Sequence, residues 1–287
     1  MSLKRPAAGG ESREREFFSC FGILTKRCSL IMIPIKAVMT AEYKIWEKCT
    51  MEIIKKISAK AKDLYGEPVP AIAFLGDSVT QGCFEIYLEE NGNCNTVFDR
   101  KHSGSSYVSD ILEVLFPQVP VCIINAGISG DNALNGSRRV ERDVLRFHPD
   151  LTVVGYGLND CGGDIEDFKR GLREIFRKLK EGGSEVIYVT PNMMNTSISC
   201  HIKETEIAAI AENTRRQQVE GRLDAIAEEG RKAAAEFGIP VCDIYSKWKL
   251  LYSNGVDTTA LLANHINHPC RKMNWLTAYS LVEVMMQ

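Results

Sequence analysis

Five short apolar segments recur along this chain between longer stretches with helical periodicity, and this alternation restricts the folds open to it. The segments are residues 71–75, 121–126, 151–156, 185–190 and 240–245, and most of them are rich in β-branched residues. Their apolar residues are nearly continuous rather than alternating with polar ones, which is typical of strands in a sheet covered on both faces. We therefore predict five strands in one parallel sheet.

Helical patterns lie between and beside these segments, at residues 105–116, 137–147, 165–180, 204–237 and 272–286. A further pattern at residues 40–65 precedes the first strand, with Tyr43, Trp46 and Ile57 on one face. Strands that alternate with helices form βαβ units, and right-handed crossovers place the helices on both faces of the sheet. The chain is therefore expected to be an α/β protein, a three-layer α/β/α sandwich around a five-stranded parallel sheet.

The composition is that of an ordinary globular protein, with 287 residues, of which 45% are hydrophobic and 25% charged. A formal charge of −2 gives no electrostatic footprint for nucleic acid. We expect a single domain over residues 39–287 that includes the N-terminal helix. The ten cysteines contain no C-x-x-C pair, so we expect free thiols and a cytoplasmic location. The oligomeric state is left open.

The N-terminal region has an apolar stretch at residues 17–35 that is interrupted by Lys26 and Arg27. Acidic residues precede this stretch and no clear cleavage site follows it, so it matches neither a signal peptide nor a membrane span. We expect residues 1–38 to lie outside the folded domain, as a disordered or non-native extension, with Met39 as an alternative start of the chain.

The segment Gly76-Asp77-Ser78-Val79-Thr80-Gln81-Gly82 directly follows the first predicted strand. It places the hydroxyl of Ser78 at the carboxyl edge of the sheet, where open α/β folds have their active sites. The alternative is that Asp77 or Ser78 only caps the next helix. A phosphate loop is disfavoured, because the Gly-Lys-Ser/Thr ending is missing and Asp77 would repel phosphate.

Other polar segments accompany the serine at this edge or near the chain end. They are residues 125–132, residues 155–160 and residues 264–269. A serine hydroxyl needs a neighbouring base to become a nucleophile, and histidine is the usual one. A glycine N–H and an asparagine side-chain NH₂ can stabilise the oxyanion of a tetrahedral intermediate. Together these residue types indicate acyl transfer.

In these four blocks the chain resembles the SGNH hydrolases, also called the GDSL esterase and lipase superfamily, from Ala71 to the C-terminus. The resemblance implies a flavodoxin-like fold, with Ser78 as the nucleophile and as one oxyanion donor. Gly130 and Asn159 match the other two oxyanion donors, and His268, followed by Pro269, matches the catalytic base. The resemblance also implies a small-molecule ester substrate, and neither a metal nor another cofactor.

One position departs from the family pattern, because His265 stands where the family usually has an aspartate, three residues before the catalytic histidine. A backbone carbonyl could orient His268 instead, which would give a Ser-His dyad, and this is the alternative we favour. Asp257 could also fold back to the imidazole, or His265 or Asn267 could donate or accept a hydrogen bond to it. A further alternative is an inactive enzyme.

The sequence thus predicts a serine esterase that hydrolyses small or short-chain acyl esters, with O-acetyl groups on carbohydrate as the leading substrate class. An acyltransferase would use the same residues. A non-catalytic acyl- or sugar-binding domain is supported only by the missing aspartate. His265, His268 and Asp257 could form a metal site, but no ligand spacing supports it, and we expect none.

Overall fold

The computed structural model describes residues 51–287, which belong to a compact unit over Lys48–Gln287. The expected extension over residues 1–38, and the first part of the helical pattern at residues 40–65, lie outside the described residues. The remaining part of that pattern forms helix α2 (Glu52–Lys62). Its apolar face is buried, since Ile53, Ile54 and Ile57 are at most 1% exposed.

The central sheet confirms the predicted architecture. It consists of β1 (Ala71–Gly76), β4 (Cys122–Gly127), β5 (Leu151–Gly155), β6 (Glu185–Val189) and β7 (Val241–Cys242). All paired neighbours run parallel, in the order β4-β1-β5-β6-β7. This is the flavodoxin-like order, which changes direction between β1 and β5 and leaves a crevice at the carboxyl ends of the strands.

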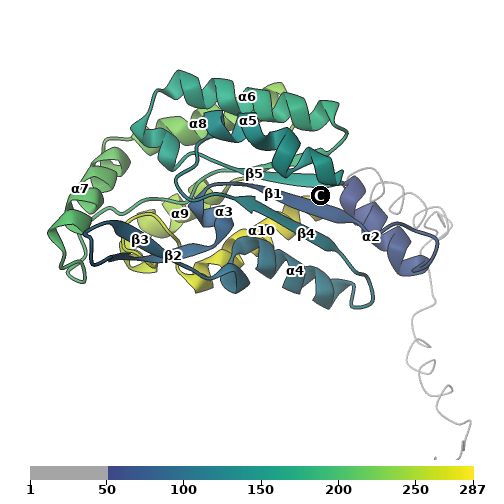
Figure 1. Cartoon of the computed structure of the whole chain (residues 1–287), viewed down its shortest axis with the longest axis horizontal. Coiled ribbons are helices and arrows are strands. Elements are labelled where there is room, and N and C mark those ends of the chain that lie inside the picture. The colour runs from purple at the N-terminus through teal and green to yellow at the C-terminus, as the bar shows by residue number, and fades with distance from the viewer. Residues whose placement is uncertain (1–50) are drawn as a thin grey trace, which may run out of the picture. The chain divides into compact units, whose positions relative to one another are not determined.

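Helices cover both faces of this sheet (Figure 1). One layer contains α5 (Ala133–Asp143), α6 (Ile165–Glu181) and α8 (Arg222–Glu236), and the other contains α4 (Gly104–Leu115) and α10 (Asn274–Met286). The main core lies between these layers and the strands, where Leu75, Val154 and Ile187 are completely buried. No helix among residues 51–287 is both long and apolar enough to cross a bilayer.

The prediction of one long helix over residues 204–237 is wrong. The segment forms two helices, α7 (Thr205–Val219) and α8, which are separated at Gly221. Gly221 has φ +79°, a left-handed conformation that a glycine adopts without steric cost and that ends a right-handed helix. The change of direction lets α7 leave the helical layer and lie beside the carboxyl ends of the strands (Figure 1).

Other elements differ from the sequence prediction. The fifth strand is shorter than predicted, because Asp243 caps α9 (Ile244–Ser253) by accepting from the N–H of Ser246. A two-stranded antiparallel hairpin, β2 (Cys83–Leu88) with β3 (Cys94–Phe98), was not predicted. It follows the short helix α3 (Ser78–Gln81). Single 3-10 turns complete the described structure, at Arg100–His102, Leu145–Phe147, Asn159–Gly162, Thr259–Leu261 and Arg271–Met273.

Candidate active site

Ser78 lies at the corner between β1 and α3, as the sequence predicts. Asp77 is the capping residue of α3, since its carboxylate accepts from the N–H of Val79 at 3.0 Å. Ser78 is therefore not needed as a cap, and its side chain is available at the carboxyl edge of the sheet. The residue is buried, with 4% of its surface exposed.

His268 lies within hydrogen-bond distance of this hydroxyl, with Nε2 at 3.0 Å from Oγ of Ser78. Its other ring nitrogen, Nδ1, is 2.9 Å from the main-chain oxygen of Phe84 in β2. A carbonyl oxygen can only accept, so Nδ1 carries the proton and Nε2 is left with a lone pair directed at the serine. Burial lowers the pKa of His268 below 6.5, while the bond to the Phe84 carbonyl acts in the opposite direction.

The loop that carries His268 is built around Asn264, a buried residue that the sequence prediction did not single out. Its side-chain oxygen accepts from the N–H groups of Ile266, Asn267 and His268 at 3.0, 2.9 and 3.0 Å. The same side chain donates to the side-chain oxygen of Asn267 at 2.9 Å. One amide thus fixes the backbone of the loop up to the histidine itself.

The other residues considered as orienters of His268 lie elsewhere. Asp257 is exposed, and its carboxylate accepts from the N–H of Ala260 at 3.2 Å. His265 has φ +55°, and its ring stacks on that of His201 with 5.3 Å between the centroids. The structure therefore brings neither Asp257 nor His265 into contact with the imidazole of His268, whose two nitrogens face Ser78 and Phe84.

Gly130 and Asn159 lie with Ser78 and His268 in one cleft, whose volume is about 370 Å³. Gly130 has φ +78°, which favours glycine at this turn. The side-chain amide of Asn159 donates one hydrogen to the main-chain oxygen of Asp131 at 2.8 Å, so the group is held in place with a second N–H left over. The rest of the cleft is lined by the hairpin, α7 and nearby loops, through Ile86, Cys94, Asn95, Thr96, Phe98, Ser129, Ile210, Asn264, Ile266 and Asn267.

A buried arginine connects the strand ends that carry these donors. Arg139 in α5 donates to the main-chain oxygens of Gly76 in β1 and Ala126 in β4, at 3.0 and 2.6 Å. It also donates to the hydroxyl of Tyr156, just after β5, at 2.8 Å, and pairs with the carboxylate of Asp131. In the sequence Arg139 looks like an ordinary charge on a helix, and nothing marks it as buried.

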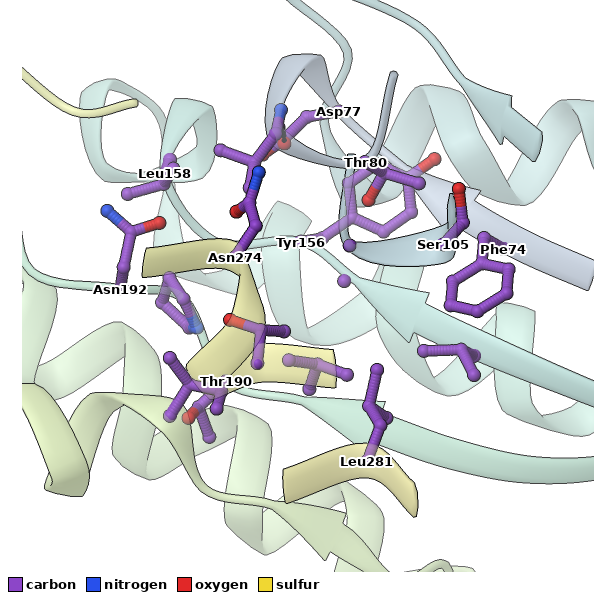
Figure 2. A pocket seen from close by; sticks show the side chains of 18 residues that line it. Phe74, Asp77, Thr80, Ser105, Tyr156, Leu158, Thr190, Asn192, Asn274 and Leu281 are labelled. Atoms are coloured by element: carbon purple, nitrogen blue, oxygen red, sulfur yellow. Dashed lines mark hydrogen bonds between the residues drawn. The ribbon is translucent and has the colours of Figure 1, made fainter. Parts of the chain in front are cut away.

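A second, smaller cavity of about 70 Å³ lies near Ser78 but is not lined by any of the four predicted catalytic and oxyanion residues. Figure 2 shows Asp77, Thr80 and Ser105 on one side of it and Thr190 and Leu281 on the other. Burial raises the pKa of Asp77 to about 7. Several neutral polar side chains reach this cavity, and none of the described residues that line it has a cationic side chain that could pair with the carboxylate.

Asp160, which follows Asn159, acts in helix capping. Its carboxylate accepts from the N–H of Ala133 at the start of α5, at 3.0 Å, and burial raises its pKa to about 6.

Among residues 51–287, no group of three or more His, Cys, Asp or Glu side chains is arranged to hold a metal ion. The cysteines in this part of the chain, from Cys83 to Cys270, are free thiols.

Comparison with known proteins gives a consistent result. The model of the GDSL-like lipase/acylhydrolase family matches residues 74–274. An acetylxylan esterase from Geobacillus stearothermophilus is 26% identical over 133 residues, which cover 42% of this chain and 58% of that protein. The match thus spans less than two thirds of this curated relative.

Solved structures share the fold. A lipase/acylhydrolase from Enterococcus faecalis superposes with a TM-score of 0.56 at 20% identity, over 76% of this chain and 96% of that one. An acetyl xylan esterase from Geobacillus stearothermophilus gives a TM-score of 0.56 at 19% identity, over 75% of this chain and 94% of that one. At these identities the likeness is evidence for the fold rather than for an activity.

Proposed function

This chain belongs to the GDSL-like lipase/acylhydrolase family, as its four sequence blocks predict, and on this premise we propose that it is a serine esterase. The family match and the acetylxylan esterase relative support a carboxylic ester hydrolase. The observation that carries the proposal is the approach of Nε2 of His268 to Oγ of Ser78, at 3.0 Å. That distance allows direct proton transfer from a nucleophile to its base.

In the proposed mechanism, Oγ of Ser78 attacks the ester carbonyl while Nε2 of His268 removes its proton. The negative oxygen of the tetrahedral intermediate accepts hydrogen bonds from the N–H groups of Ser78 and Gly130 and from the side chain of Asn159. His268 then gives its proton to the leaving alcohol oxygen. A water molecule, deprotonated by the same imidazole, then attacks the acyl-serine. The bond between the acyl carbon and Oγ breaks as His268 returns the proton to Oγ, which releases the carboxylic acid and restores Ser78.

The role of the usual aspartate is assigned to the main-chain oxygen of Phe84. It accepts from Nδ1 of His268 at 2.9 Å, which keeps the imidazole in the tautomer that can act as a base. A carbonyl is neutral and stabilises an imidazolium less than a carboxylate does, but residual catalysis persists without the acid in serine proteases. We therefore favour an active Ser78–His268 dyad over an inactive enzyme.

The proposed substrates are esters of short acyl groups with neutral alcohols, with O-acetyl groups on carbohydrate as the leading candidate. The relatives described above include esterases named for acetylated xylan. Among residues 51–287, the side chains that line the cleft are uncharged apart from the imidazole of His268 and the thiol of Cys94. A charged leaving group would therefore find no counter-charge among them. Amide and hydroxyl groups such as those of Asn95, Asn267 and Ser129 suit a hydroxyl-rich alcohol.

The remaining proposals concern the domain boundaries, the location of the protein and the acceptor of the acyl group. We retain residues 39–287 as one hydrolase domain, preceded by an extension over residues 1–38. The free thiols in the described part of the chain support a reducing compartment, and we propose a cytoplasmic location. An acyltransferase would share every step up to the acyl-serine and would differ only in using a sugar hydroxyl rather than water for deacylation.

A burst assay tests the proposal. Wild-type and Ser78→Ala proteins are mixed with p-nitrophenyl acetate and p-nitrophenyl butyrate, and the acylated species are located by mass spectrometry. An acyl group on Ser78 that is absent from the variant supports the serine esterase, and the ratio of the two burst rates gives the acyl-length preference. Turnover by Ser78→Ala at the wild-type rate would refute the mechanism.

Absence of both acylation and turnover would favour the binding-domain alternative. Acetyl transfer to added xylooligosaccharide would identify the acyltransferase.

A further inference from the structure

The carbonyl oxygen that accepts from Nδ1 of His268 belongs to a strand outside the central sheet. Phe84 is in β2, which within residues 51–287 pairs only with β3, in a separate two-stranded sheet. A short hairpin of this kind is marginally stable by itself and needs packing to hold its position. The distance between the Phe84 carbonyl and the imidazole therefore depends on whatever fixes the hairpin to the loop of His268.

Arg271, three residues after His268, makes that connection. Its guanidinium lies over the ring of Phe84, at 4.3 Å from the centroid, and Phe84 is completely buried. Two of its nitrogens donate to the carboxylate of Glu85 in β2, at 2.5 and 3.1 Å. The third, Nε, donates to Asp99 at 2.7 Å, directly after β3 ends. One side chain thus holds both strands at the base of the hairpin.

The charges at this contact are complementary. Hydrogen bonds from Arg271 lower the pKa of Glu85 and of Asp99, so both carboxylates are ionised at neutral pH. A single exposed ion pair contributes little, but a bidentate pair combined with a second carboxylate and an aromatic face fixes the geometry of the arginine. A lysine offers neither the planar fork nor the stacking surface.

We propose that Arg271 is a positioning residue that holds the Phe84 carbonyl against Nδ1 of His268, and so keeps in place the group that orients the imidazole where the family has an aspartate. This inference rests on the proposed function, in which His268 is the base. Arg271 does not touch the reacting atoms. It acts through the hairpin, and its loss should release the imidazole from a single tautomer and orientation. Because the hairpin also lines one side of the cleft, a smaller effect on substrate binding is expected as well.

The kinetic test compares Arg271→Met with Arg173→Met. Arg173 is a matched control, because its side chain is 33% exposed against 32% for Arg271, and it also makes a two-point contact with a glutamate, Glu236. With p-nitrophenyl acetate we expect kcat of Arg271→Met to fall roughly 10- to 10²-fold, with a smaller change in KM, since small displacements of catalytic groups have effects of this size. Arg173→Met should retain the wild-type kcat, and Arg271→Lys should recover only part of the loss. Equal values of kcat in the two methionine variants would overturn the proposal.

A spectroscopic readout separates this inference from the proposed function. In ¹⁵N-labelled protein, above the pKa of His268, the ring nitrogens should report a proton on Nδ1 in the wild type and a mixture of tautomers in Arg271→Met. Unchanged ring signals in a folded Arg271→Met protein would refute the positioning function while leaving the esterase intact. Failure of wild-type Ser78 to react with a fluorophosphonate would refute the esterase and leave the tautomer measurement valid.

A second variant keeps the proposal testable if Arg271→Met does not fold. Glu85→Gln removes the two-point contact alone and should give a smaller change in the same direction. Wild-type ring signals and a wild-type kcat in that variant would overturn the proposal.

Discussion

Asp77, the residue before the proposed nucleophile, gives a stability prediction with a defined sign. Its carboxyl is 3% exposed, and burial, followed by the nearby charges of Asp160 and Asp131, raises its pKa from 3.8 to about 7. The folded protein therefore holds a proton on Asp77 at pH values where the unfolded chain has lost it. Stability must fall as the pH rises from 3.8 through about 7, because the unfolded state binds fewer protons in that range.

The size of the effect follows from the same two values. Each step of one pH unit in that range costs the folded state about 1.4 kcal/mol, so the whole range amounts to about 4 kcal/mol. Asparagine keeps the side-chain oxygen that accepts from the N–H of Val79, and it is an equally good capping residue. Asp77→Asn should thus gain up to about 4 kcal/mol over the wild type between about pH 4 and about pH 8.

Urea unfolding of both proteins at these two pH values measures the difference, and titrating groups that do not interact with Asp77 cancel in the comparison. Asp164→Asn is the matched control. Asp164 caps α6 in the same way, by accepting from the N–H of Glu166 at 3.0 Å, but it is exposed to solvent. Because Asp164 is exposed, Asp164→Asn should show no comparable gain over the wild type between these pH values. The reasoning would be refuted if the Asp77→Asn gain were no larger than that of the control.

Other predictions concern catalysis with p-nitrophenyl acetate. Asn159→Ala should lower kcat by about 10²–10³-fold through loss of an oxyanion donor, and a wild-type kcat would remove Asn159 from the hole. His268→Ala should abolish acylation of Ser78, whereas Asp257→Ala and His265→Ala should keep most of kcat, because neither side chain contacts the imidazole. A loss at Asp257 equal to that at His268 would replace the dyad by a triad. The pH profile of kcat/KM should rise through one deprotonation with a midpoint below 6.5, since burial lowers the pKa of His268, and a midpoint above 6.5 would contradict this assignment.

The strands could be predicted because a buried parallel strand consists of a nearly continuous run of apolar residues. The apolar segments at residues 71–75 and 151–156 correspond to β1 and β5 almost residue for residue. The hairpin could not be recognised in this way, because β2 and β3 are partly exposed and, within residues 51–287, pair with each other rather than with the central sheet. Gly221 was a usable signal for the break between α7 and α8, but the continuous charged and Ala-rich pattern on either side obscured it.

The site was predictable where chemistry is carried by side chains in recognisable blocks. The sequence pointed to Ser78 and His268, and the structure places them 3.0 Å apart. It could not point to Phe84, because the contributing atom is a main-chain oxygen that every residue has. Arg139 and Arg271 escaped notice for a related reason. Each is a common helix or loop residue, and only the tertiary structure brings Arg139 to strand ends more than ten positions away in the chain.

Because a main-chain oxygen makes the contact to His268, substitutions at position 84 and insertions or deletions near it have different consequences for the site. A substitution at codon 84 keeps the accepting oxygen atom, and one that keeps an aromatic ring also keeps the surface on which Arg271 lies. A side-chain acid, by contrast, can be lost by a single base change. The vulnerable property is the spacing between the nucleophile and residue 84. Because successive carbonyls of a strand point to opposite sides, the insertion or deletion of one residue would turn the acceptor away from the imidazole. Insertions and deletions that preserve the reading frame in this short stretch should therefore be rarer among descendants of this gene than substitutions at position 84 that keep a buried aromatic ring.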